Sequence, residues 1–396
     1  MAASKRKKMF HFQEQIEHLQ GQHLFRSLLP IGSEQSTIID YDGRKCLLFC
    51  SNNYLGLANH PALKMAATSA IESWGVGAGA SRLISGNFNI NRSLELRLAQ
   101  FKQTESALVF TSGYTANIGA IAALMEKTDL ILADRRNHAS LVDGCRLSKG
   151  KFRIYRHKDT DQLRRLLSSR KENQNTLIVT DGVFSMDGDI APLPEILRLA
   201  EQFDAFIYLD DAHGTGVLGP RGRGTCDHFQ LRSNRIIQMG TFSKALGGFG
   251  GFVAGCELLV KYLINKARPF IYTTALPPSV LASALASLDI VEKDSILRDQ
   301  LWKNRDYLFH SLTQLGFSLC GSETPIIPLH IGSSEKALLF SQKLLQGGIF
   351  IPAIRPPTVP PGTSRLRITL MATHTREQID FLLLLLEKIG RELRLI

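Results

Sequence analysis

The sequence lacks the marks of secreted, zinc-binding and membrane-spanning proteins. It has six cysteines in 396 residues, and no two of them form a C-x-x-C pair, so we expect free thiols and neither a zinc site nor a disulfide framework. Its apolar runs are short, such as residues 381–386, whereas a membrane-spanning helix needs about 20 apolar residues. No apolar segment follows the basic residues 1–8, which therefore do not resemble a secretory signal, and we expect a cytoplasmic protein.

Composition and charge are those of an ordinary globular protein with an excess of positive charge. Hydrophobic residues make up 44% of the chain and charged residues 21%, and 396 residues suffice for two or more domains. The formal net charge is +11, but the basic residues are scattered and show no interleaving with aromatic residues, which disfavours nucleic-acid binding. A positive field would instead attract an anionic acyl carrier, such as coenzyme A or acyl carrier protein.

Short apolar segments alternate with helical segments between about residues 105 and 255. This alternation predicts an α/β fold with a mostly parallel central sheet flanked by helices. Ligands of such sheets bind beyond the carboxyl ends of the strands. The expected strands are residues 107–110, 130–133, 152–155, 176–180, 206–209, 236–239 and 251–254.

The N-terminal region has a helical pattern. Phe12, Ile16, Leu19 and His23 recur at helical spacing, which predicts an amphipathic helix within residues 9–25 that lies across the body of the protein. We expect residues 1–45 to form this helix and an extension.

Two further domains are expected after residue 45. Residues 46–285 should form the large domain, and residues 286–396 a smaller α+β domain with a Pro-rich loop at 352–362. The final helix should bury one apolar face, made of Ile379, Leu382, Leu383, Leu386 and Ile389. Residues 75–80 (GVGAGA) match a loose dinucleotide-binding pattern, but a helical segment rather than a strand precedes them, which disfavours a Rossmann site.

Two strand ends carry the most informative residues. Lys244 lies in a turn of small residues (TFSKALGG, 241–248) directly after the expected strand 236–239, and its amine could condense with an aldehyde. Asp210 and His213 follow the strand 206–209 in the sequence DDAHGTG. Taken singly, such a lysine is more often solvated, and paired aspartates are often helix caps. Together, a lysine for a Schiff base and an acid for a pyridinium nitrogen are what pyridoxal phosphate (PLP) requires of a protein.

Other strand ends point to the same site. After residue 110, Gly113 permits a tight turn before a helix whose free N–H groups could bind a phosphate, although a plain strand-to-helix turn explains this sequence equally well. His138 follows the strand 130–133 and could stack on an aromatic cofactor, whereas a lone histidine is more often structural. Ser185 follows the strand 176–180 and could reach the phenolic oxygen of the cofactor.

The chain resembles the α-oxoamine synthases, fold-type I PLP enzymes that join an amino acid to an acyl thioester with loss of carbon dioxide. The resemblance extends from about residue 12 to the C-terminus. It rests on residues 52–56 (NNYLG), 111–117 (TSGYTAN), 137–140 (NHAS), 181–188 (DGVFSMDG), 210–216 (DDAHGTG) and 241–244 (TFSK). Within that family, the loop at 353–370 is similar to that of the 8-amino-7-oxononanoate synthases of biotin synthesis.

The resemblance implies roles around the cofactor. Lys244 would bind PLP and then act as acid–base catalyst. Asp210 would hold the pyridine nitrogen, His138 would stack on the ring, and His213 and Ser185 would contact the phenolic oxygen. The phosphate would be bound by Ser112, Gly113, Tyr114 and Thr241, and by Thr273 or Thr274 of the neighbouring subunit in a homodimer with a shared site. Tyr114 departs from the family, in which phenylalanine is common at this position.

It also implies how the substrates bind. Arg355 would clamp the carboxylate of the amino acid through its planar guanidinium, with Thr358 in the same loop. Arg26 and Asn52 match positions that line the acyl-substrate side. No metal is expected.

The expected reaction is the condensation of L-alanine with a pimeloyl thioester to 8-amino-7-oxononanoate, carbon dioxide and the free thiol carrier. The carrier could be coenzyme A or acyl carrier protein, since both present the same pantetheine arm. The alternatives are a glycine C-acetyltransferase, a longer-chain acyl-amine synthase, or a silent subunit that partners an active homologue. Such subunits typically lack the lysine, which is present here at position 244.

Overall fold

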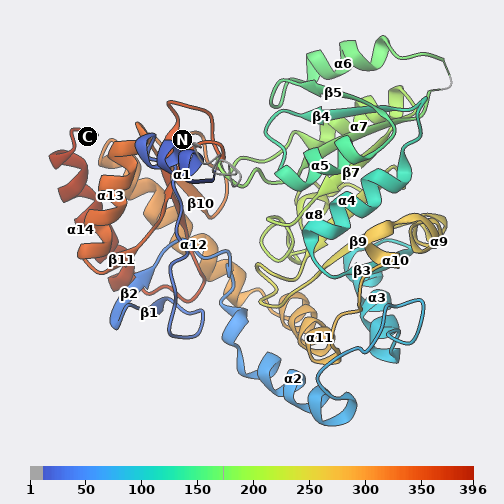
Figure 1. Ribbon diagram of the computed structural model, residues 1–396, viewed down its shortest axis with the longest axis horizontal. Helices are drawn as coiled ribbons and strands as arrows, with labels where there is room; N and C mark the ends of the chain where they lie inside the picture. Colours follow the sequence, from blue (N-terminus) through green and yellow to red (C-terminus); the bar gives the residue numbers. More distant parts are fainter. Residues whose placement is uncertain (1–11, 173) are drawn as a thin grey trace, which may run out of the picture.

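A computed structural model describes residues 12–172 and 174–396 of the chain; the basic residues 1–8 lie outside this range. Figure 1 shows two lobes, one with the large sheet and one with the C-terminal helices and two small sheets. Within the described residues, no helix combines the length and apolar character that crossing a membrane requires.

The large lobe is built on a seven-stranded sheet. Its strand order is β3-β9-β8-β7-β6-β4-β5, and β9 alone runs antiparallel to its neighbours. All seven strands match the segments expected from the apolar runs, which confirms the α/β fold. Their bounds are β3 (Ser106–Phe110), β4 (Leu130–Asp134), β5 (Lys151–Tyr155), β6 (Thr176–Asp181), β7 (Phe206–Asp210), β8 (Ile236–Thr241) and β9 (Gly251–Gly255).

Helices bury both faces of this sheet, which is why its strands are nearly all apolar, except for the edge strand β5, whose Lys151, Arg153 and Ile154 are exposed. One core cluster joins one face to α4 (Gly113–Leu124), α5 (Ala139–Leu147), α9 (Glu257–Lys266) and α10 (Arg268–Ile271). Another cluster joins the opposite face to α6 (Thr160–Ser168), α7 (Leu193–Gln202) and α8 (Thr225–His228).

The largest core cluster continues from the β3 edge of the sheet into the second lobe. It includes η1 (Leu57–Asn59), α2 (Pro61–Trp74), α3 (Asn89–Lys102) and α11 (Pro278–Lys293). The segment before the glycine-rich residues 75–80 is thus the helix α2, as expected, and this glycine stretch does not follow a strand.

The second lobe contains two three-stranded sheets. One has the antiparallel order β10-β13-β12, and the other has the order β1-β2-β11. The elements are β1 (Ile38–Tyr41), β2 (Arg44–Leu48), α12 (Ile296–Gln314), β10 (Ile326–Gly332), α13 (Ser334–Gln346), β11 (Ile349–Phe350), β12 (Ala353–Ile354), β13 (Ser364–Thr369) and α14 (Arg376–Glu392). Helix α14 buries Ile379, Leu382, Leu386 and Ile389 of the apolar face predicted for the final helix, and the fifth predicted residue, Leu383, is partly buried.

The division at residues 45/46 and 285/286 stays a prediction. β2 spans the first boundary and pairs with β11 near the other end of the chain. α11 spans the second boundary and packs on α2 and α3.

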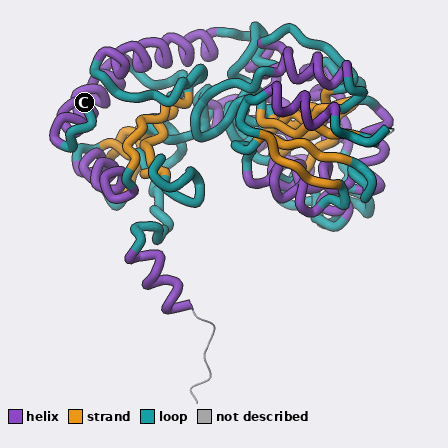
Figure 2. The backbone as a smooth tube through the Cα atoms, turned by 90° about the horizontal axis from the view of Figure 1, so that it is seen from above, coloured by secondary structure: helices purple, strands orange, loops and turns teal. Residues whose placement is uncertain are grey.

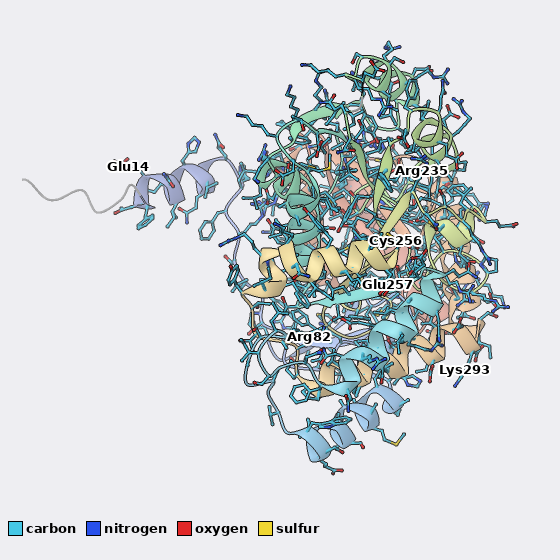
Figure 3. The ribbon with its side chains drawn as sticks, turned by 90° about the vertical axis from the view of Figure 1, so that its right-hand side faces the viewer. Glu14, Arg82, Arg235, Cys256, Glu257 and Lys293 are labelled. Carbon is cyan, nitrogen blue, oxygen red and sulfur yellow. The ribbon has the colours of Figure 1, made fainter. Side chains whose placement is uncertain are left out.

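The N-terminal helix does not lie across the body. α1 (Phe12–Gly21) has no buried residue, and it projects away from both lobes in Figures 2 and 3, where Glu14 marks it. Phe12 is 61% exposed, and His23 lies beyond the helix with a positive φ of 56°. The periodicity correctly predicted the helix, but none of its residues is buried within the part of the chain that the structure describes.

Candidate active site

A cavity of about 210 Å³ opens at the carboxyl ends of the parallel strands. Eight of the sequence-predicted residues line it: Ser112, Gly113, Tyr114, His138, Asp210, His213, Thr241 and Lys244. They meet because the carboxyl ends of β6, β7 and β8 and the loops after β3 and β4 share one edge of the sheet.

Lys244 lies in the turn after β8, as predicted. The side chain is half-buried, and desolvation lowers the pKa of its amine to about 8 although Asp210 and Asp181 oppose the shift. An amine with this pKa is neutral in an appreciable fraction of molecules near neutral pH, and a neutral amine is the nucleophile that attacks an aldehyde.

Asp210 is held in one orientation. One carboxylate oxygen accepts a hydrogen bond from Asn117 Nδ2 at 2.7 Å, and the other accepts from the Ala212 amide at 3.0 Å. Asn117 also donates to Ser140 Oγ at 2.8 Å, so both of its amide hydrogens are engaged. The carboxylate is 4% exposed and lines the cavity, ready to accept a hydrogen bond from a ligand N–H.

His138 caps α5 while its side chain remains exposed toward the cavity. Its Nδ1 lies 2.7 Å from Ser140 Oγ and accepts from the Ser140 amide at 3.3 Å. Its own amide donates to Asp181 Oδ2 at 2.7 Å. Desolvation lowers the pKa of the His138 ring, and desolvation together with the nearby Asp210 raises the pKa of Asp181 well above its usual value.

His213 is buried beside a hydroxyl and a guanidinium. Its Nδ1 lies 2.7 Å from the Tyr54 hydroxyl, and desolvation, reinforced by Lys244 and Arg367, lowers its pKa well below the usual value. Arg367 donates to Tyr54 Oη at 3.4 Å, to Asn52 Oδ1 at 3.0 Å and to the Ser185 carbonyl. The Arg367 guanidinium is therefore linked to His213 through the Tyr54 hydroxyl, and it also binds Asn52 in the same segment as Tyr54.

Sequence reasoning did not assign Tyr54, Asn117, Asp181 or Arg367 to the site. Tyr54, Asn117 and Asp181 lie inside the motifs on which the family resemblance rests, so the sequence could have pointed to them as site residues. Arg367 lies on β13 of the other lobe, two residues from Arg365, and only the folded chain shows which of these arginines donates to Tyr54 and Asn52.

One end of the cavity is suited to an anion. Ser112 caps α4 by accepting from the Thr115 amide at 3.1 Å, whereas the amides of Gly113 and Tyr114 have no acceptor within the helix. A Cβ at Gly113 would lie 2.9 Å from Met239 Cε and 3.5 Å from Thr241 Cβ, so glycine keeps this end open. The Thr241 hydroxyl donates to the Gly250 carbonyl at 2.7 Å.

Several predicted residues do not line this cavity. Ser185 contributes its carbonyl to Arg367, as above. Thr273 lines a small separate cavity together with Arg82, and Thr274 forms a β-bridge with Ser81.

The predicted substrate-binding residues differ in position: Arg26, Arg355 and Thr358 line neither of the two cavities beside Lys244, whereas Asn52 does. Asn52 lines a second cavity of about 450 Å³ that shares Ser243 and Lys244 with the first. Arg355, 9% exposed, donates to the carbonyls of His23 and Phe25, the latter at 3.3 Å.

The loop of Arg355 also contacts the N-terminal segment. Arg26 donates to the Pro356 carbonyl at 3.0 Å, and the amide of the exposed Thr358 donates to the Arg355 carbonyl at 3.1 Å. In this structure the guanidinium of Arg355 thus binds the backbone after α1, while Arg367 lies nearer to Lys244.

The first cavity fits the PLP that the sequence predicts. The free amides at the start of α4 suit its phosphate, the fixed Asp210 suits its pyridine nitrogen, and the exposed His138 ring offers a flat surface. The lowered pKa of Lys244 suits attack on its aldehyde.

Comparisons with known proteins agree with this geometry. Residues 44–384 match the family model of aminotransferase class I and II. The 8-amino-7-oxononanoate synthase of Geobacter sulfurreducens is 49% identical over 384 residues, which are 96% of this chain and 98% of the relative. A high-resolution structure of SPT (serine palmitoyltransferase) with PLP superposes with a TM-score of 0.93 at 32% identity and covers both chains completely. The 8-amino-7-oxononanoate synthase of Francisella tularensis superposes with a TM-score of 0.77 at 30% identity, over 88% of this chain and 98% of that one.

Proposed function

This chain belongs to the aminotransferase class I and II family and, within it, to the 8-amino-7-oxononanoate synthases, and from this we propose that it condenses L-alanine with a pimeloyl thioester. The products are 8-amino-7-oxononanoate, carbon dioxide and the free thiol carrier. The observation that carries the proposal is the half-buried Lys244, its pKa lowered to about 8, in one cavity with the fixed carboxylate of Asp210.

Bound PLP supplies an electron sink for the pair of electrons left when a bond to the α-carbon of the amino acid breaks. Asp210 would hold the ring nitrogen, and Asn117 and the Ala212 amide keep that carboxylate in place. His138 would lie against the ring, and Gly113, Tyr114 and Ser112 would hold the phosphate together with Thr241. Lys244, in its neutral form, accepts the α-proton of alanine and returns a proton later.

His213 and Ser185 are proposed to contact the phenolic oxygen. Because desolvation keeps the pKa of His213 low, its imidazole is neutral and can donate one hydrogen bond while Tyr54 fixes the other ring nitrogen. Arg367 binds the Ser185 carbonyl and thereby sets the position of that loop.

The second cavity, on the Asn52 side of Lys244, has room for the acyl arm. Arg355 and Thr358 are proposed to bind the carboxylate of alanine, and Arg26 and Asn52 the acyl substrate. Since Arg355 now binds the backbone at His23 and Phe25, its role in binding alanine requires that this contact be exchanged for the substrate.

The protein is further proposed to act as a homodimer in the cytoplasm. Thr273 and Thr274 do not line the cavity of their own chain, which supports their contribution to the site of a neighbouring subunit. The six cysteines are free, as is usual in a reducing compartment. Pimeloyl-CoA and pimeloyl acyl carrier protein are both compatible donors.

The test is an assay of the purified protein with L-alanine and either pimeloyl donor, with mass-spectrometric detection of 8-amino-7-oxononanoate. Lys244→Ala should abolish turnover, whereas a silent partner subunit would tolerate this change. A graded series of acyl thioesters should peak at pimeloyl. Turnover of glycine and acetyl-CoA without any pimeloyl product, or a preference for simple fatty acyl chains, would refute the substrate assignment.

A further inference from the structure

The side chains of the two adjacent aspartates at the end of β7 have different surroundings. Asp210 lines the cavity, whereas the Asp211 side chain is fully buried behind it. One Asp211 oxygen accepts from the amide and hydroxyl of Thr225 at 3.0 and 2.6 Å. The other accepts from Lys102 at 2.7 Å and from the Thr215 hydroxyl at 3.3 Å.

Lys102, the last residue of α3, is as deeply buried as its partner. Both side chains have 0% exposure. Its ammonium group donates to Asp211, to Thr215 Oγ1 at 3.1 Å and to the Arg223 carbonyl at 2.5 Å. All three ammonium hydrogens therefore have acceptors. A buried ion pair adds little net stability, because desolvation offsets the attraction, so its presence calls for another explanation.

The surrounding backbone leaves the Asp211 carboxylate a single position. A Cβ at Gly214 or at Gly224 would collide with its oxygens. The main chain adds to this: the Asp211 amide donates to the Met239 carbonyl, and the amides of Gly214 and Thr215 donate back to the Asp211 carbonyl. The turn from 211 to 215 is thus pinned from behind, and His213 lies at its centre.

We propose that the buried Lys102–Asp211 pair is a positioning element for the reaction, which holds Asp210 and His213 at the cavity from behind the turn 211–215. Lys102 is not among the residues that line the cavity, so it acts through Asp211. This inference rests on the proposed function, because the residues that it positions are those expected to contact PLP. The sequence offers no hint of the pair, since 109 residues separate its two members.

The test uses full-length protein loaded with PLP. Removing one charge would leave the other buried and unpaired, which destabilises the fold, so the main variant is the double change Lys102→Met with Asp211→Asn. Thr215→Val is a milder variant of similar volume that removes one hydroxyl from the pair without changing charge. Arg97→Met is the control on the same helix, since Arg97 pairs with Glu292 and Asp289 and with no residue of the turn 211–215.

The double variant should keep its thermal unfolding midpoint without PLP within a few degrees of wild type. Its kcat should fall about 10- to 100-fold with little change in KM, its Kd for PLP should rise, and the pH midpoint of the cofactor absorbance should shift. Thr215→Val should shift the same quantities in the same direction by less, and Arg97→Met should shift none.

The inference is overturned if Thr215→Val and the double variant both keep the cofactor absorbance, the PLP affinity and the kcat of the wild-type protein. If the double variant fails to fold, Thr215→Val alone decides in the same way. An equal loss in Arg97→Met would also overturn it, because any loosening of α3 would then suffice. Failure of the wild-type protein to bind PLP or to turn over its substrates would refute the proposed function instead.

Discussion

Replacing Lys244 by Met should make the PLP-free protein more stable at neutral pH while abolishing activity. Desolvation lowers the pKa of the Lys244 amine from 10.5 to about 8, so the unfolded chain binds a proton more readily than the folded chain between these values. At about 1.4 kcal/mol per pH unit, and allowing for a partly exposed side chain, burying the charged amine costs about 2–3 kcal/mol at pH 7. Met removes this cost.

The sign of the pH dependence makes the prediction specific. Because the folded pKa is the lower one, the full cost is present below pH 8 and fades as the pH rises from 8 to 10.5. Urea unfolding of both proteins, followed by far-ultraviolet circular dichroism at equal protein concentration, should show a gain for Lys244→Met of about 2–3 kcal/mol at pH 7 and almost none near pH 10.5.

The matched control is Lys293→Met at an exposed lysine. The Lys293 side chain is 76% exposed at the molecular surface, where Figure 3 labels it, so this change should alter stability little at either pH. The reasoning is refuted if Lys244→Met is no more stable than wild type at pH 7, or if its advantage persists unchanged at pH 10.5.

Three further predictions test the site and its supports. Asp210→Asn should lower kcat by about 100- to 1000-fold in the alanine and pimeloyl thioester assay, because the neutral amide no longer stabilises a protonated ring nitrogen; unchanged kcat would contradict its role. Burial lowers the pKa of His157, but hydrogen bonds to Asp134 and Asp189 outweigh it and raise the pKa to about 9. His157→Gln should therefore cost about 2–3 kcal/mol in urea unfolding at pH 7, and the deficit should vanish as the pH rises through 9; a deficit independent of pH would count against this. Gly251→Ala would place a Cβ 2.7 Å from the backbone at the start of α4. Because such overpacking costs about 1–3 kcal/mol, titration with PLP should show a Kd raised about tenfold. An unaltered Kd would show that phosphate binding does not depend on this spacing.

The apolar runs of the chain by themselves determined the seven strands of the large sheet. Fully buried parallel strands must be apolar along most of their length, so the pattern of β4, β6 and β8 is visible without the structure, whereas the edge strand β5 is largely exposed and mixes apolar and basic residues. The loops after such strands meet at one edge, which is why Lys244, Asp210, His213, His138 and Gly113 could be placed in one site from the sequence. The same physics did not fix the place of α1, since an amphipathic pattern predicts a helix but not what the helix packs against, and none of the described residues of α1 is buried.

The tertiary structure alone decided which polar side chains pair across the lobes. Arg355 and Arg367 are equally basic in the sequence, yet one binds the backbone at His23 and the other Tyr54 beside His213. Periodicity reports which face of an element is buried, whereas the partner of a buried charge depends on segments far away in the chain. Such a pairing exists only once the folded backbone has brought both groups within hydrogen-bonding distance and excluded water from around them.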